Sequence, residues 1–193
     1  MNDSFGLDVA RNELIKEFLA TDCEWLFFMD DDVVCCKNIM DIFTIKDAQI
    51  VAPYSNSFHD DPVISVYQWT NDDRDRLMNM PHETMLEVME KCKVAGIRPV
   101  YPIADMVGNC YAVRRDVFDK VVDDDGDWFK LNWRTPSGEI RRGEDTYFFR
   151  RCNELGIYTH VAFDVRVGHH KVIDLAQLYD ANHGIGPKFE EKK

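Results

Sequence analysis

The sequence predicts an α/β layered domain, and two observations support this prediction. Amphipathic helical segments alternate along the chain with short apolar runs, which is the pattern of strands packed against helices. The run Trp25-Leu-Phe-Phe-Met29 is apolar throughout, as is typical of a strand buried on both faces of a parallel sheet. The 193 residues, 45% of them hydrophobic, suit one domain with a real core. We predict one domain over residues 1–186 and a charged tail over 187–193.

The N-terminal half begins with a predicted helix over residues 8–20. Its expected apolar stripe comprises Val9, Leu14, Ile15, Phe18 and Leu19. The strand at 25–29 follows and ends abruptly at Asp30-Asp31-Asp32. A short helix is expected over 38–43, with strands over 49–52 and 63–68.

The C-terminal half contains the clearest helix, over residues 82–95, with Gly96 as its stop signal. Its expected inward positions are Met85, Leu86, Met89 and Cys92. A further helix is expected over 143–156, followed by a strand over 157–163. No repeat or Gly/Ser linker interrupts the chain, which favours a single domain.

Charge and hydropathy exclude several classes of protein. Thirty-five acidic residues against 23 Lys and Arg give a formal charge of −12, which disfavours nonspecific binding of nucleic acid. No run of 18 apolar residues occurs, so no transmembrane segment is predicted. The polar N-terminus lacks the features of a signal peptide. The six cysteines form no CxxC pair, so we expect reduced core residues in a cytoplasmic protein and no zinc site.

The triple aspartate at residues 30–32 is the strongest local signal. Ligands of open α/β sheets bind at the carboxyl ends of strands, and Asp30 and Asp32 could offer oxygen ligands to Mg²⁺ or Mn²⁺ there. The alternative is a solvated acidic turn that caps the next helix.

Two further segments carry candidate chemistry. Glu144 and Asp145 fall in the first turn of a predicted helix, where they either serve the helix dipole or act in general base catalysis. His169 and His170 follow an apolar stretch and are either structural or ligands of Mn²⁺. The acidic segment 123–127 does not match a calcium loop, because its glycine is fourth rather than sixth; we predict a turn.

Taken in order, the segments ARNELIKEFL, EWLFFMDDDVV, DMVGNCYAVRRDVF, GEDTYFFRRCNELG and VRVGHH resemble glycosyltransferases of the GT-A fold. The resemblance is to family 2 and its phage and bacterial relatives, and it covers most of the chain from Arg11 to His170. It implies a three-layer nucleotide-diphospho-sugar transferase fold with a mixed, mostly parallel central sheet. It also implies metal-dependent transfer of a sugar from a nucleotide-diphosphate donor to a carbohydrate or other acceptor hydroxyl, with inversion.

The resemblance implies metal ligands and donor-binding residues. Asp30 and Asp32 match the DxD motif that holds Mn²⁺ or Mg²⁺ against the diphosphate, and His169 matches a further metal contact. The residues assigned to donor binding are Arg11, Asp31, Gly108 and Asn109.

The same resemblance matches Glu144 and Asp145 to the "ED" pair of inverting members, in which the aspartate is the catalytic base. For the acceptor, Trp128 and Trp133 are candidates for stacking on sugar faces, with core packing as the alternative.

The chain departs from this pattern at its start, because relatives carry a strand-helix-strand unit before the "ARN" helix. The expected fold is therefore N-terminally shortened, and an exposed sheet edge would favour a homodimer. Two alternatives remain open. One is a non-catalytic GT-A-like domain that binds sugar or protein. The other is a nucleotidyltransferase, although the Gly-rich basic loop expected of one is missing.

Overall fold

The computed structural model describes residues 6–57, 63–71, 74, 76–135 and 138–169. Its central sheet has five strands in the order β1-β10-β3-β13-β8. They are β1 (Trp25–Met29), β3 (Ile50–Tyr54), β8 (Val100–Ala104), β10 (Cys110–Arg114) and β13 (Thr159–Arg166). The charged tail predicted for residues 187–193 lies outside the described residues, as does His170.

The sheet is mixed, as the sequence predicts. Strands β3 and β13 pair in parallel, whereas β1 with β10, β10 with β3, and β13 with β8 are antiparallel pairs. Strands β1, β3 and β13 therefore share one direction, but in the described sheet only β3 and β13 are parallel neighbours. The expectation of mostly parallel pairing is corrected here, because β10, which the sequence analysis did not predict, lies between β1 and β3.

Strand β1 is an edge strand of the described sheet with an antiparallel neighbour, rather than the strand of a parallel sheet that its apolar run suggested. Among the described strands it pairs with β10 alone, from Trp25 opposite Arg114 to Met29 opposite Cys110. Its residues still contact apolar groups on both faces, because Phe28 joins the main core and Phe27 packs on the other side. Burial on two faces thus explains the apolar run without a parallel neighbour.

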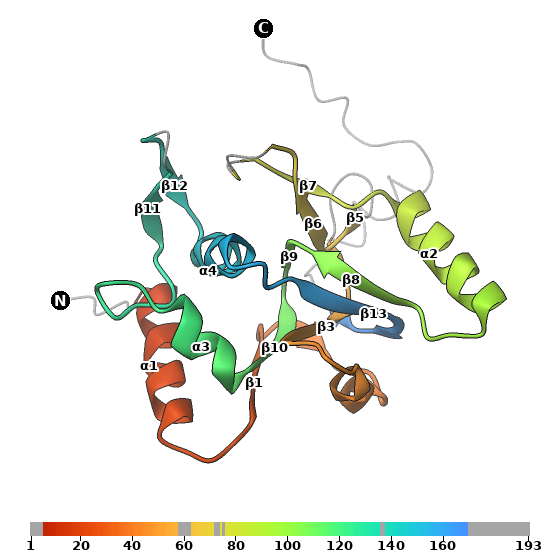
Figure 1. Ribbon diagram of the computed structural model, residues 1–193, viewed down its shortest axis with the longest axis horizontal. Coiled ribbons are helices and arrows are strands. Elements are labelled where there is room, and N and C mark those ends of the chain that lie inside the picture. Colours follow the sequence, from red (N-terminus) through yellow and green to blue (C-terminus); the bar gives the residue numbers. More distant parts are fainter. Residues whose placement is uncertain (1–5, 58–62, 72–73, 75, 136–137, 170–193) are drawn as a thin grey trace, which may run out of the picture.

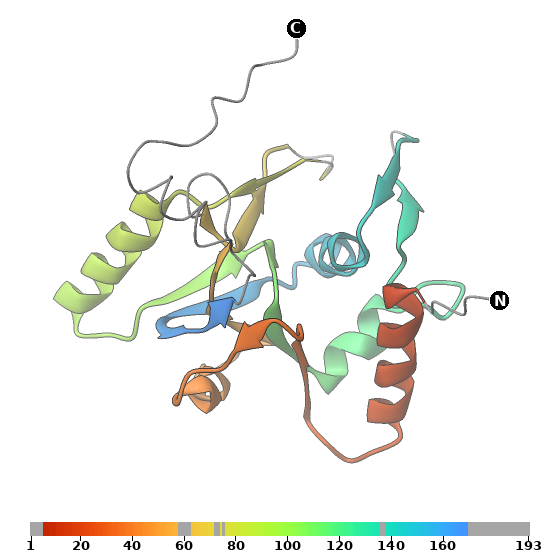
Figure 2. The same cartoon turned by 180° about the vertical axis from the view of Figure 1, so that it is seen from behind.

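Helices and a short 3₁₀ segment cover the two faces of this sheet. The helices are α1 (Leu7–Leu19), α2 (His82–Ala95), α3 (Arg115–Val121) and α4 (Glu144–Glu154). Figure 1 shows α1, α3 and α4 beside the β1–β10 side of the sheet and α2 beside β8; Figure 2 shows the same arrangement from behind. The opposite face is covered by η1 (Ile39–Thr44), where the expected short helix lies, through the fully buried Ile42.

The inward faces of the first two helices differ from the predicted stripes. In α1 the buried side chains are Arg11, Asn12, Ile15 and Phe18. Val9 and Leu14 are 42% and 48% exposed instead. In α2, Met85 is buried as expected, whereas Leu86 is 51% exposed.

The remaining strands form small sheets around the central one. The segment predicted as one strand at 63–68 is two strands that Ser65 separates. The short strands are β2 (Val33–Val34), β4 (Asn56–Ser57), β5 (Val63–Ile64), β6 (Val66–Trp69), β7 (Leu77–Asn79), β9 (Met106–Val107), β11 (Asn132–Arg134), β12 (Ile140–Arg142) and β14 (Gly168–His169). Within the described part of the chain, no helix combines the length and apolar character needed to cross a membrane.

Candidate functional site

The candidate site lies where β1, β3 and β13 end at one edge of the sheet. The triple aspartate follows β1, and β14 follows β13 after one residue. Strand β14 pairs with β2, which places the backbone of His169 opposite Val33, the residue after Asp32. The topology therefore brings together two segments that lie 136 residues apart in the chain and that the sequence assigned to one metal site (33 to 169).

Backbone hydrogen bonds fix the aspartate turn. The amide of Asp30 donates to the carbonyl of Asn109 (2.9 Å), and the amide of Val33 donates to the carbonyl of Asp30 (3.2 Å). Asn109 has a left-handed backbone, with φ of 70°. Its amide group reaches Ser55 Oγ (3.2 Å), and neither Asn109 nor Gly108 lines the cavity described next. Gly108 and Asn109, both expected in the donor site, thus lie next to the aspartate turn but outside the lining of the cavity.

A cavity of about 610 Å³ opens between α1, β1, the aspartate turn and the start of α4. One part of its wall is apolar and includes Leu7, Leu14 and Phe28. The other part is charged and consists of Arg11, Asp30, Asp31, Asp32, Glu144 and Asp145. Six of the predicted site residues therefore share one cavity.

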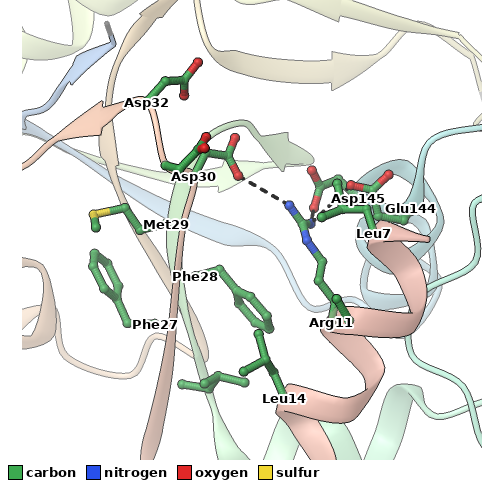
Figure 3. Close-up of a pocket in the computed structure, with 13 residues that line it drawn as sticks. Leu7, Arg11, Leu14, Phe27, Phe28, Met29, Asp30, Asp32, Glu144 and Asp145 are labelled. Atoms are coloured by element: carbon green, nitrogen blue, oxygen red, sulfur yellow. Dashed lines mark ion pairs between the residues drawn. The ribbon is translucent and has the colours of Figure 1, made fainter. Parts of the chain in front are cut away.

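The guanidinium of Arg11 occupies the centre of this charged wall (Figure 3). Its Nη2 lies 3.5 Å from Asp30 Oδ1, and its Nη1 lies 3.7 Å from Glu144 Oε1 and forms an ion pair with Asp145 Oδ1. The side chain is 8% exposed and lies over the rings of Phe28 and Phe129. Because few water molecules can screen a buried cation, these ion pairs are stronger than surface ones.

Asn12, the neighbour of Arg11, explains how α1 holds the arginine in place. Its Oδ1 accepts hydrogen bonds from the amides of Trp128 and Phe129, both at 3.0 Å, and its Nδ2 donates to the carbonyl of Phe129 at 2.9 Å. The side chain is buried. Asn12 thereby binds α1 to the loop after α3, and this contact holds the neighbouring Arg11 in position over the sheet.

Glu144 and Asp145 are the first residues of α4, as the sequence predicts. No side chain caps this helix, and Gly143 precedes it with φ of 121°. Two carboxylates in the first turn favour the helix dipole. The Glu144 side chain is 10% exposed and that of Asp145 is 21% exposed, so Asp145 is the more accessible of the pair.

Tyr111 of β10 belongs to the site and was missed by the sequence analysis. Its hydroxyl accepts a hydrogen bond from Arg11 Nη1 (3.1 Å) and donates one to Asp145 Oδ1 (2.8 Å). The sequence signal that could have indicated it is the short, mostly apolar run Cys110–Arg114, which forms the buried strand next to β1.

The two tryptophans expected at the acceptor side are buried. Trp128 is 8% exposed, and its indole nitrogen donates to the carbonyl of Phe118 (2.8 Å). Trp133 is 6% exposed and packs against Tyr147 and Arg150. Since a sugar can stack only on an accessible ring face, this burial favours the core packing alternative, although Trp133 also lines two smaller cavities.

The carboxylates of the turn suit a hard divalent cation bound together with a diphosphate. Asp30 and Asp32 line one cavity, and Mg²⁺ is commonly held by one or two carboxylates plus substrate phosphates. In the described part of the chain, no group of three or more His, Cys, Asp and Glu side chains has the geometry of a complete metal cage.

The fold corresponds to the GT-A class of α/β proteins. Among solved structures, the chain is similar to the crystal structure of GalNAc-T7 with UDP, GalNAc and Mn²⁺, with a TM-score of 0.57 and 15% sequence identity. The match covers 88% of this chain and 31% of that one. No protein-family model matches the sequence, and no relative is found among curated proteins. The likeness shows the GT-A fold.

Proposed function

We propose that this chain is a metal-dependent glycosyltransferase that moves a sugar from a nucleotide-diphosphate donor to an acceptor hydroxyl, with inversion. The observation that carries the proposal is the single cavity shared by Asp30, Asp32, Arg11 and Asp145. The GT-A fold supports it, and so does the structural neighbour, which holds UDP and Mn²⁺.

In this proposal Asp30 and Asp32 hold Mn²⁺ or Mg²⁺, and His169, whose backbone lies opposite Val33, supplies a further ligand. When bound, the cation stabilises the negative charge that develops on the departing diphosphate. Arg11 offers a second positive charge beside Asp30, and a guanidinium is well suited to phosphate oxygens. The apolar wall around Leu14 and Phe28 is suited to the flat face of the nucleoside base.

Asp145 is proposed as the base that takes the proton of the acceptor hydroxyl while that oxygen attacks the anomeric carbon. Glu144 pairs with the same guanidinium and so shares the charge of Arg11 with Asp145. Asp31 lines the cavity, and the carbonyl of Asn109 accepts the amide of Asp30; both are proposed as supporting members of the donor site. The proposed enzyme is cytoplasmic, and the exposed free thiols of Cys23 and Cys35 suit a reducing compartment.

The test is thermal unfolding with Mn²⁺ across a panel of nucleoside diphosphates and their sugars. A ligand present at 100 times its Kd stabilises the folded state by about 2.7 kcal/mol, which raises the Tm of a domain of this size by about 5–10 °C. The rise should require both metal and nucleotide. Asp32→Asn should abolish it, and the matched exposed change Asp124→Asn should leave it intact. Equal shifts in both variants would contradict the metal role.

One observation favours the non-catalytic alternative, namely the ion pair between Arg11 and Asp145, because it engages the carboxylate that is proposed as the base. Product analysis separates the cases. A glycosyltransferase releases a nucleoside diphosphate, a nucleotidyltransferase releases pyrophosphate, and a binding domain gives the Tm shift with no product.

A homodimer that forms through the outer edge of β1 is a secondary proposal, and light scattering in solution tests it.

A further inference from the structure

The hydroxyl of Tyr111 is a polar group in an otherwise apolar part of the core. The residue is 1% exposed, and its ring lies between those of Phe28 and Phe149, with centroids 5.2 and 4.9 Å away. A phenylalanine would fill the same space without the cost of burying a hydroxyl. The hydroxyl must therefore be explained by what it contacts.

The direction of the two hydrogen bonds at this hydroxyl follows from donor counting. Burial raises the pKa of Tyr111 well above its ordinary value, so the phenol keeps its proton. A guanidinium has no acceptor atom, so Arg11 Nη1 donates to the phenol oxygen and the phenol proton points to Asp145 Oδ1. The chain Arg11–Tyr111–Asp145 thus has one possible polarity.

Both groups that hold Asp145 use the same carboxylate oxygen. Tyr111 donates to Oδ1, and the ion pair from Arg11 also reaches Oδ1. The charged groups that face this pair are Arg11 from α1, Asp30 after β1 and Glu144 on α4. The contacts that the structure gives for Asp145, from Tyr111 and from Arg11, thus reach Oδ1, and Asp145 also lines the cavity.

We propose that Tyr111 is a positioning residue that anchors Oδ1 of Asp145 and thereby makes Oδ2 the oxygen that receives the acceptor's proton. The proposal rests on the proposed function, because it assigns an atom within that function's catalytic base. Tyr111 itself is enclosed and touches no substrate.

Tyr111→Phe tests the proposal, because it removes only the hydroxyl and leaves the ring packing in place. Tyr147→Phe is the matched control. Tyr147 lies on α4 and also donates to an aspartate, at 2.7 Å from Asp123 Oδ2, but it does not line the cavity. We expect Tyr111→Phe to lower kcat about tenfold with little change in the donor KM. The acidic limb of its pH–rate profile should move to higher pH, because a hydrogen bond to the charged form of a carboxylate favours that form.

A second readout needs no substrate. Titration of the Asp145 carboxyl carbon by NMR should give a midpoint at higher pH in Tyr111→Phe than in the unaltered protein, and Tyr147→Phe should leave that midpoint unchanged. An unchanged midpoint in Tyr111→Phe, or equal loss of kcat in both variants, would overturn the positioning role.

Asp145→Asn separates failure of this proposal from failure of the proposed function. If Asp145→Asn abolishes transfer while Tyr111→Phe matches the unaltered protein in rate and titration, the positioning role is wrong and the proposed function stands. If transfer survives in Asp145→Asn, the proposed base is wrong, and Tyr111 then has no catalytic group to position.

Discussion

Nη2 of Arg11 lies 3.5 Å from Oδ1 of Asp30, across the cavity that the two residues share. The same guanidinium contacts Glu144 and Asp145 at the start of α4. One buried cation therefore balances three carboxylates that come from two distant segments. Stability and site geometry both depend on this cation.

Arg11→Met should destabilise the protein by about 3 kcal/mol at pH 7, because methionine retains apolar packing but leaves three neighbouring carboxylates without their counter-ion. Salt partly screens the repulsion between these carboxylates, so the difference in stability from the unaltered protein should shrink at high ionic strength. Urea unfolding at low and high salt measures this difference. The control is Lys16→Met on the same helix, which removes an exposed ion pair with Glu13 and should leave the urea midpoint unchanged. A loss of stability that is equal at the two salt concentrations would contradict the electrostatic cause.

Asp123 is expected to make stability depend on acid pH. The segment 123–127 is a turn, as predicted, in which Asp123 Oδ1 accepts the amides of Asp125 and Asp127. Burial alone would raise the pKa of Asp123, but hydrogen bonds from Lys130 and Tyr147 outweigh it and lower the pKa to about 2.

Because this pKa is depressed, the stabilising contribution is present above about pH 4 and is lost as the pH falls through about 2. Asp123→Asn should therefore cost on the order of 1–2 kcal/mol at pH 7 and only a small part of that at pH 2. Guanidinium unfolding across this range measures the difference, and Asp124→Asn serves as the exposed control. A penalty that persists at pH 2 would show that the turn, rather than the charge, is responsible.

Much of the site could be predicted because its residues stand where elements end. Asp30 follows an unmistakable apolar strand, and Asp145 opens a helix with a clear amphipathic pattern. The common direction of β1, β3 and β13 then brings the aspartate turn and β14 together. Those parts depend on local pattern and on general rules of sheet topology.

The remaining features depend on contacts between distant segments. Apolar periodicity assigned Val9 and Leu14 to the inward face of α1, but that face carries Arg11 and Asn12. Their partners Tyr111 and Phe129 lie 100 and 117 residues away in the chain. Strand β10 is five residues long and lacks the alternation of a solvent-facing strand, so Tyr111 escaped notice. A local sequence pattern cannot predict that a polar side chain is buried when its hydrogen-bond partner lies far away in the chain.

The cysteines should divide into two classes by reactivity. Cys110 and Cys152 are buried as expected, whereas Cys23 and Cys35 are exposed, so the expectation that all six cysteines are core residues is wrong for these two. Burial, with a smaller effect of nearby Cys35, raises the pKa of the Cys110 thiol to about 12, and burial also raises that of Cys152. Since the thiolate is the reactive form, iodoacetamide at pH 8 should modify Cys23 and Cys35 in the folded protein. Peptide mass spectrometry should find Cys110 and Cys152 modified only after unfolding. Rapid labelling of Cys110 in the folded state would contradict its buried position.

Gly143 precedes Glu144 and Asp145, the proposed catalytic pair, and its replacement should affect function as well as stability. Its φ of 121° is one that other residues rarely adopt, and a Cβ there would lie 3.2 Å from Thr146 Oγ1. The residue cannot easily shift, because its amide donates to Leu131 and its carbonyl accepts from Trp133. Gly143→Ala should therefore cost on the order of 1–3 kcal/mol and displace Asp145 from Tyr111.

The control is Gly96→Ala, at the end of α2, where φ is 66° and the new Cβ would meet open space. This change should cost about 1 kcal/mol without affecting the site. Unfolding and transfer assays on both variants should show kcat reduced more than tenfold in Gly143→Ala alone, since misplacing a catalytic group by about 1 Å is costly. Equal kcat values in the two variants would mean that α4 tolerates movement at its start and that the placement of Asp145 does not limit the rate.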